Sequence, residues 1–278
     1  GKKFVWNTEQ TGAVGRFSTK GLDTLVNEVP GETGIFREAY TKHQKLSAAV
    51  RHYVNALFGA EGLIVIDADC QDLKALFKNV IREDVLNNVT RKLVDKTNNS
   101  LETLGYKVQV FCREINFFYL ADGIRSRIEQ HGDQFKVLDT GLTFSTTEIE
   151  QLIAEEPEKF SPNVVLRGIF QETILPNIAF IGGGSETAYW LELKNLFEHY
   201  QVPFPVLVLR NSYVLISKMQ EDMLQKTGWK LEDLFETDFE LMNRLVKKQS
   251  DRVLSLDREI SATKQLYASI KSNASAID

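Results

Sequence analysis

Three glycines in a row separate an apolar segment at 177–181 from a helical pattern at 186–200, and they are Gly182, Gly183 and Gly184. Because glycine has no Cβ, a ligand can approach the backbone closely at such a bend. Ser185 is a good N-cap residue, and the first-turn amides that follow it would point at an anion. The pattern predicts a strand, a bend and a helix that bind an anionic group at the carboxyl end of the strand.

The glycine run matches neither of two common phosphate-binding motifs. No Gly-Lys-Ser/Thr follows it, as a Walker A loop requires, and Thr187 stands where the dinucleotide fingerprint has its third Gly or Ala. Glu186 favours the helix dipole but would repel a phosphate, so it suits a hydroxyl or amine of a substrate better. A tight turn that binds no ligand is the alternative interpretation.

Further polar residues flank this unit. Arg210 and Asn211 follow an apolar segment at 205–209, which is expected to be the second strand of a βαβ unit. An arginine at a carboxyl strand end can grip a carboxylate or phosphate with its fork of N–H donors. Arg167 and Gln171 precede the unit, and for Arg167 a structural ion pair is an equal alternative to ligand binding.

A second candidate strand at 62–67 is a continuous apolar, β-branched run that ends in Asp67, with Asp69 close behind. Acids at a strand end can bind a ribose, polarise an amine or hold a metal, and capping a turn is an equal alternative. His43 and His52 are expected on one helix, where their spacing makes no metal pair. No histidine is assigned a catalytic role, and no metal is predicted.

Composition and charge limit the possible functions. The 278 residues are 43% hydrophobic and 26% charged, with a formal net charge of −5, which gives no support for binding a nucleic-acid backbone. No apolar run is long enough to span a membrane, and the first residues do not resemble a signal peptide. Cys70 and Cys112 make no disulfide framework and are expected to be small buried hydrophobes. A cytoplasmic protein fits best.

The local sequence patterns predict an α/β fold that consists of five regions. Residues 1–60 form a helical and β insert, with strand-like pieces near 4–6 and 13–17 and a long helix at 33–58. Residues 61–95 form a core strand and helix, 96–160 an antiparallel β insert with a helix at 146–155, and 161–227 the core with the glycine-rich loop. Residues 228–278 form a coiled-coil helix. In the β insert, strands are expected at 106–111, 115–120 and 124–129.

Apolar residues recur every seven positions in the last region, which is typical of a coiled coil. One series is Phe239, Val246, Val253, Ile260 and Tyr267, and the second is Met242, Gln249, Leu256, Thr263 and Ile270. One helix over 228–272 is predicted, with a second copy or further chain as its partner. An amphipathic helix that lies on its own domain is the alternative.

Several segments around the glycine run closely resemble the BshC family of bacillithiol biosynthesis. The strongest are 160–167, 171–177, 179–190, 197–205 and 209–212, with weaker similarity at 58–67 and 109–119. The resemblance covers essentially the whole chain. It implies a Rossmann-like core with parallel strands, two connecting inserts and a coiled-coil arm that forms a homodimer.

The resemblance also implies an activity. Family members are expected to act as a cysteine ligase, joining cysteine to glucosaminyl malate in a step driven by a nucleotide, with ATP or ADP bound. They begin with a further segment that holds the first half of the core and an acidic, histidine-containing motif, and they continue beyond the coiled coil. The present chain is therefore expected to hold part of an active site and to be inactive alone.

These observations combine into one hypothesis, which is ATP-dependent amide formation. The three glycines and Ser185 would cradle an anionic group, Arg210 would clamp a carboxylate, and Glu186 would hold the amine or hydroxyl. Tyr189 and Trp190 would shape the pocket, one of them being plain core. Two rivals remain, a nucleotide- or sugar-binding transferase of the same fold and a non-catalytic coiled-coil scaffold.

Overall fold

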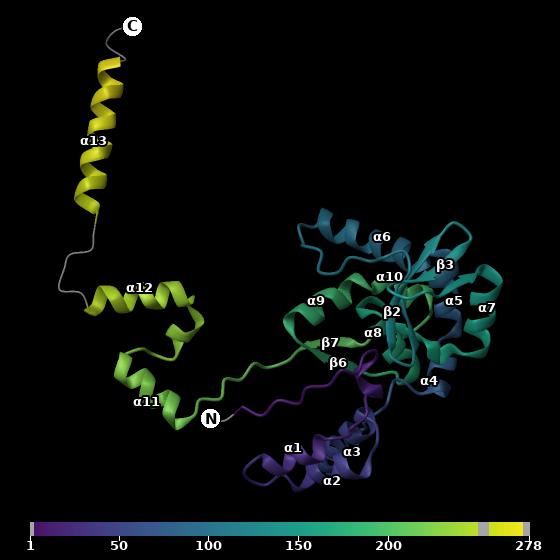
Figure 1. The fold of residues 1–278 in the computed structure, drawn as a ribbon. Helices are drawn as coiled ribbons and strands as arrows, with labels where there is room; N and C mark the ends of the chain where they lie inside the picture. The colour runs from purple at the N-terminus through teal and green to yellow at the C-terminus, as the bar shows by residue number, and fades with distance from the viewer. Residues whose placement is uncertain (1–2, 250–255, 275–278) are drawn as a thin grey trace. The chain divides into compact units, whose positions relative to one another are not determined.

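The computed structural model describes residues 3–249 and 256–274. The chain divides into two compact units, Gly1–Arg210 and Asn211–Asp278 (Figure 1). The first unit mixes helices with two sheets, and the described part of the second is helical. The expectation of an α/β chain is therefore confirmed. The candidate site lies in the first unit, apart from Asn211.

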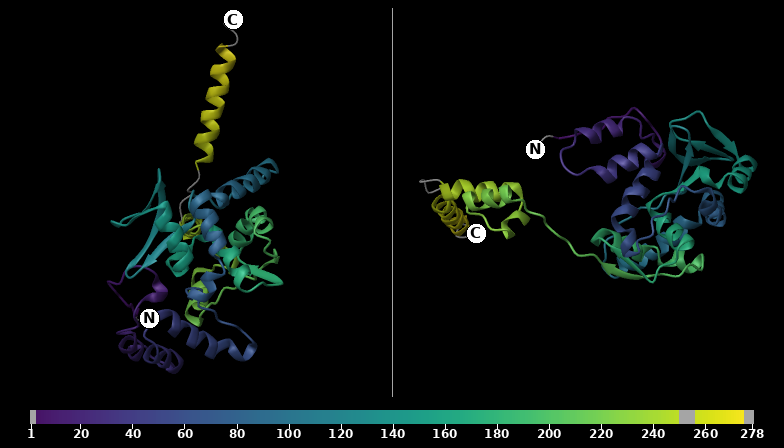
Figure 2. Two further views of the ribbon diagram at one scale, coloured as in Figure 1. Left: turned by 90° about the vertical axis from the view of Figure 1, so that its right-hand side faces the viewer. Right: turned by 90° about the horizontal axis from the view of Figure 1, so that it is seen from below.

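The first unit begins with a cluster of short helices that lie side by side (Figures 1 and 2). They are η1 (Val14–Arg16), α1 (Leu22–Glu28), α2 (Gly34–Lys42), α3 (Leu46–Phe58) and η2 (Gly59–Glu61). The expected single helix at 33–58 is wrong, because the backbone is extended at His43 and Lys45. There Lys45 forms a β-bridge with Ser18, and the Leu46 amide donates to the Phe17 carbonyl at 2.8 Å. The strand-like piece expected at 13–17 is mostly the 3₁₀ turn η1.

The apolar segment at 62–67 is not a strand. Its residues Leu63, Ile64 and Ile66 are exposed, Ile64 by 71%. A strand needs a neighbouring backbone to bond to, and no described segment pairs with this one. The core strand expected at 62–67 is therefore wrong.

Three helices follow, α4 (Gln71–Ala75), α5 (Lys78–Asn87) and α6 (Val89–Thr103). The expected helix after residue 70 is broken at Phe77, whose backbone leaves the helical conformation. Phe77 is 1% exposed, and its ring centroid lies 5.0 Å from that of Phe170. The break thus turns a large aromatic side chain into the core.

The larger sheet is antiparallel, in the order β4-β3-β2-β1-β5. Its strands are β1 (Phe117–Ala121), β2 (Ile124–His131), β3 (Gln134–Val137), β4 (Thr143–Ser145) and β5 (Phe160–Pro162). The antiparallel pairing expected for strands near 115–120 and 124–129 is present in β1 and β2. The predicted helix α7 (Thr146–Glu155) is confirmed too, with Ser145 and Glu148 forming a capping box. The 3₁₀ turn η3 (Pro157–Lys159) leads from it into β5.

The expected strand at 106–111 is absent because its amides bond to a side chain. Gln109 and Val110 donate their backbone N–H groups to the buried carboxylate of Glu192, at 2.6 and 3.2 Å. The Glu192 carboxylate thus accepts hydrogen bonds that the carbonyls of a neighbouring strand would otherwise accept.

The second sheet holds the predicted βαβ unit. After α8 (Val164–Ile174), strand β6 (Ala179–Gly182) leads through α9 (Gly184–Glu192) and α10 (Lys194–His199) to β7 (Val206–Leu209). The two strands are parallel, with Gly182 opposite Leu209. Parallel pairing is therefore limited to these two strands among the described residues, and the broader parallel core is not seen.

Trp190 anchors α9 to this sheet. Its side chain is 1% exposed and stacks on Phe180 of β6, with ring centroids 4.0 Å apart and an interplanar angle of 19°. Burying an indole contributes about 3 kcal/mol or more. Trp190 is thus core, and Tyr189, which is half-buried, is left as the aromatic residue beside the bend.

The second unit contains α11 (Lys218–Thr227), η4 (Glu232–Phe235), α12 (Asp238–Gln249) and α13 (Asp257–Ala274). The expected helix from 228 is wrong at its start, because Gly228 adopts a left-handed conformation that ends α11. Seven apolar heptad residues are exposed, namely Phe239, Met242, Val246, Leu256, Ile260, Tyr267 and Ile270. Val253 lies outside the described residues. No described helix is long and apolar enough to cross a membrane.

Candidate active site

The glycine bend turns strand β6 directly into helix α9. Gly183 is the N-cap residue, with φ −70° and ψ 170°, and the helix begins at Gly184. The predicted strand–bend–helix unit is confirmed, but Ser185 as its N-cap is wrong. Ser185 is already the second helical residue, and it is exposed.

The Glu186 side chain bonds directly to the backbone of the bend. Its Oε2 accepts a hydrogen bond of 2.8 Å from the backbone amide of Gly183. This is half of a capping box, since Gly183 has no side chain to return a bond to the first turn. The amides of Gly184 and Ser185 therefore have no intrahelical acceptor, as at any helix start.

The three glycines have three different surroundings. A Cβ on Gly182 would lie 2.5 Å from the ring of Phe180, so this position is filled by the protein itself. A Cβ on Gly183 would lie 3.1 Å from Nη2 of Arg210, whereas one on Gly184 would meet nothing within 4 Å. The expected close approach of a ligand is thus possible at Gly183 and Gly184 but not at Gly182.

Arg210 is held beside the bend. Its backbone amide donates to the carbonyl of Gly182 at 2.9 Å, which extends the pairing of β6 with β7. Its side chain is exposed, and its guanidinium makes no hydrogen bond or ion pair with the residues that the structure describes. An uncommitted guanidinium beside free helix amides is an arrangement that attracts anions.

Tyr189 and Arg167 belong to the same neighbourhood. Burial raises the pKa of the Tyr189 hydroxyl, the negative charge of Glu186 acts in the same direction, and Arg167 opposes it. Both charges therefore act on this half-buried phenol. Three predicted residues thus meet at the bend, namely Gly183, Glu186 and Arg210, and the charges of Glu186 and Arg167 both act on Tyr189.

Gln171 and Asn211 do not join this group through any described contact. Gln171 donates to Glu172 at 3.1 Å, and Glu172, fully buried, accepts two further bonds from Asn177. These bonds fix the turn between α8 and β6. Asn211 belongs to the second unit, where it donates to the Tyr213 hydroxyl at 3.3 Å.

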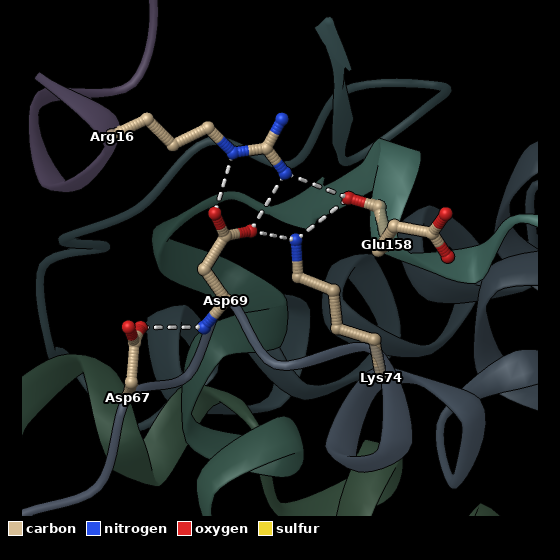
Figure 3. Close-up of polar contacts among 5 residues, drawn as sticks. All are labelled: Arg16, Asp67, Asp69, Lys74 and Glu158. Atoms are coloured by element: carbon tan, nitrogen blue, oxygen red, sulfur yellow. Dashed lines mark hydrogen bonds and ion pairs between the residues drawn. The ribbon is translucent and has the colours of Figure 1, made fainter. Parts of the chain in front are cut away.

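Asp67 lies in a separate cluster (Figure 3). Its Oδ1 accepts a 3.0 Å bond from the Asp69 amide, which is the turn-capping role. Asp69 bonds to Arg16 at 2.5 Å and to Lys74 at 2.6 Å, and both cations also donate to the Glu158 carbonyl. The cluster therefore ties η1, α4 and η3 together.

Burial opposes the ionisation of Asp69, but the bonds from Arg16 and Lys74 outweigh it and lower its pKa. Burial also lowers the pKa of Lys74, against the attraction of Asp69. The sequence alone could not reveal this cluster, because its members lie far apart along the chain. The described residues contain no group of three or more His, Cys, Asp or Glu placed to bind a metal.

Comparison with known proteins decides the family. Residues 1–211 match the family model "Bacillithiol biosynthesis BshC, N-terminal Rossmann-like domain". The chain belongs to the BshC family. The Rossmann-like description agrees with the βαβ unit that carries the glycine bend.

Several curated BshC relatives match over all or nearly all of the chain. A protein from Cytophaga hutchinsonii named "Putative cysteine ligase BshC" is 38% identical over 100% of this chain and 53% of its own length. Proteins of the same name from Flavobacterium psychrophilum and Flavobacterium johnsoniae are each 39% identical, over 97% and 96% of this chain. The chain thus spans about half the length of these relatives.

Proposed function

We propose that this chain contributes part of the active site of a cysteine ligase that joins cysteine to glucosaminyl malate in bacillithiol biosynthesis. The support is the family, the name that its relatives carry, and the anion-attracting geometry of the glycine bend. The single observation that carries the site assignment is the uncommitted Arg210 guanidinium next to Gly183.

Amide formation needs an activated carboxylate and an amine. A bound ATP would supply the group that turns one carboxylate oxygen of cysteine into a leaving group. The bend fits such a ligand, because a Cβ on Gly184 would meet nothing within 4 Å and the amides of Gly184 and Ser185 lie before the first intrahelical hydrogen bonds of α9. We assign the binding of an anionic oxygen to these amides and to Arg210.

Glu186 is the residue to which we assign the substrate amine. One carboxylate oxygen holds the bend, which leaves the other to accept a hydrogen bond from the attacking amine. Tyr189, half-buried between the charges of Glu186 and Arg167, would orient the substrate. Positioning and charge stabilisation would supply most of the rate, as expected where no residue becomes covalently bound.

The exposed heptad residues support the proposal that the second unit pairs with another copy of the chain. Apolar side chains seven residues apart bury their surface in a two-stranded coiled coil. The enzyme would then be a homodimer that acts in the cytoplasm on small molecules. The family resemblance implies these points, and the exposed apolar heptad residues support the pairing of two copies.

A complementation experiment tests the proposed function. Cells that lack the gene receive the intact gene or the Arg210→Ala variant, and bacillithiol and glucosaminyl malate are quantified by mass spectrometry. We expect the deletion to lose bacillithiol and accumulate glucosaminyl malate, and the variant to lower turnover about 100-fold. Lys194→Ala, an exposed change on α10, is the control and should restore bacillithiol.

Two outcomes would contradict the proposal. Normal bacillithiol in the deletion strain would refute the ligase function itself. Full restoration by Arg210→Ala would instead refute the site while leaving the function standing. Accumulation of a nucleotide sugar in place of glucosaminyl malate would favour the transferase alternative.

A further inference from the structure

A cavity of about 480 Å³ opens beside the helical cluster at the start of the chain. Helix α3 forms most of its wall, together with the end of α2 and the segment after η2. The lining residues are His43, Ala48, Arg51, His52, Asn55, Ala56 and Val65. None of them is a predicted site residue, and none is an acid.

The sequence of α3 explains the hollow. Positions 48, 51, 52, 55 and 56 follow the spacing of one helix face, so their side chains share one side. The two alanines on this face leave space, and the longer polar side chains between them border it. Val65 supplies an apolar wall from the segment that failed to form a strand.

Two histidines meet in this cavity. Nε2 of His43 lies 2.9 Å from Nδ1 of His52, so one nitrogen donates and the other accepts. The contact exists because the chain breaks between α2 and α3, which brings His43 back to the middle of α3. Glu38, whose Oε1 lies 3.8 Å from Nε2 of His52, is itself paired with Lys42.

Arg51 supplies a free positive charge. It is exposed, and its guanidinium makes no hydrogen bond or ion pair with the described residues. The side chain of Asn55 adds an amide at the same wall. Cationic and neutral N–H donors thus border a partly apolar hollow without any lining carboxylate.

We propose that this cavity binds a small organic acid, with its carboxylate held by Arg51 and the His43–His52 pair. The inference goes beyond the proposed ligase function and does not rest on it. Guanidinium and carboxylate match as two parallel hydrogen bonds, and an imidazole N–H adds a third. The alanines and Val65 would contact the carbon skeleton, which inorganic phosphate lacks.

Titration of the 278-residue chain with succinate tests the proposal. The readout is the ring ¹H–¹⁵N signals of the histidines, which report both the binding and the hydrogen bonding of each ring nitrogen. We expect saturable shifts of His43 and His52 but not of His131. Arg51→Gln should weaken succinate binding about tenfold or more, as for the loss of one charge-assisted hydrogen bond.

Matched variants separate the possible results. Arg37→Gln removes an exposed arginine of α2 that does not line the cavity, and its affinity for succinate should equal that of the parent. Equal succinate affinity in Arg51→Gln, or no saturable shift of His43 and His52, would overturn the proposal. Tighter binding of inorganic phosphate than of succinate would overturn the assignment to an organic acid. Circular dichroism checks that each variant is folded.

Discussion

The backbone amide of Arg210 bonds to the carbonyl of Gly182, and this single contact places the arginine side chain against Gly183. The two residues are 28 positions apart, so the pairing of β6 with β7 creates the neighbourhood. Residues that follow the two strands thus meet at one edge, as the carboxyl ends of parallel strands do.

The glycines of the bend should differ in their tolerance of a side chain. Gly182→Ala is expected to lower the free energy of unfolding by about 1–3 kcal/mol, because its Cβ would overlap the Phe180 ring. Gly184→Ala is the matched control, since its Cβ would meet nothing within 4 Å. Urea denaturation measures both, and equal stability of the two variants would contradict the packing of Phe180 against Gly182.

Removing Asp69 should leave the buried ammonium group of Lys74 without its carboxylate partner. The Lys74 side chain is only 4% exposed, so Asp69→Ala is expected to lower the free energy of unfolding by about 3 kcal/mol. The double variant Asp69→Ala with Lys74→Met should recover most of that loss, because no unpaired charge then stays buried. If the double variant is as unstable as the single one, the charge pair is not the cause.

Asp84 should make stability depend on pH. Burial raises its pKa from 3.8 to about 6, although Asn116 donates two hydrogen bonds to it. Between pH 3.8 and about 6, the Asp84 carboxyl is therefore protonated in the folded state and ionised in the unfolded state. The stabilisation from the raised pKa of Asp84 is complete below pH 3.8 and is lost as the pH rises through about 6. The free energy of unfolding falls by about 3 kcal/mol in all over this range.

Urea denaturation between pH 4 and 7 checks this slope. Asp84→Asn should remove it, because an amide does not titrate in this range. Asp133→Asn, an exposed change in the turn between β2 and β3, should keep the slope of the parent. A slope that survives in Asp84→Asn would assign the pH dependence to other groups.

The two cysteines should react at very different rates. Cys70 is exposed, whereas Cys112 is half-buried against the core and burial raises its pKa to about 12. A thiol reacts as its thiolate, so iodoacetamide at pH 8 should modify Cys70 well before Cys112. Peptide mass spectrometry gives both rates, and faster labelling of Cys112 would contradict its described surroundings.

Local patterns predicted much of the fold. The antiparallel strands near 124–129, the capped helix at 146–155 and the βαβ unit around the glycines depend on neighbours in the sequence, and all are present. The failures have distant causes. The helix at 33–58 breaks because 43–45 bonds to 17–19, and the strand at 106–111 is replaced by bonds to Glu192.

In the candidate site, too, local patterns were predicted and contacts made by tertiary packing were not. The sequence predicted the bend and the arginine that follows the second strand, because a βαβ unit brings them together by topology. It could not predict that Glu186 holds Gly183, or that the ring of Phe180 fills the space beside Gly182. The contact of His43 with His52 was missed because both were assigned to one unbroken helix.

A pair of parallel strands is too small to keep its own shape. The stiffness of the bend must therefore come from the layer beneath it, where the indole of Trp190 lies flat on the ring of Phe180. The ring of Phe180 in turn fills the space at Gly182, whose carbonyl fixes Arg210. The stack of Trp190 on Phe180 thus helps to fix where the Arg210 side chain lies beside Gly183.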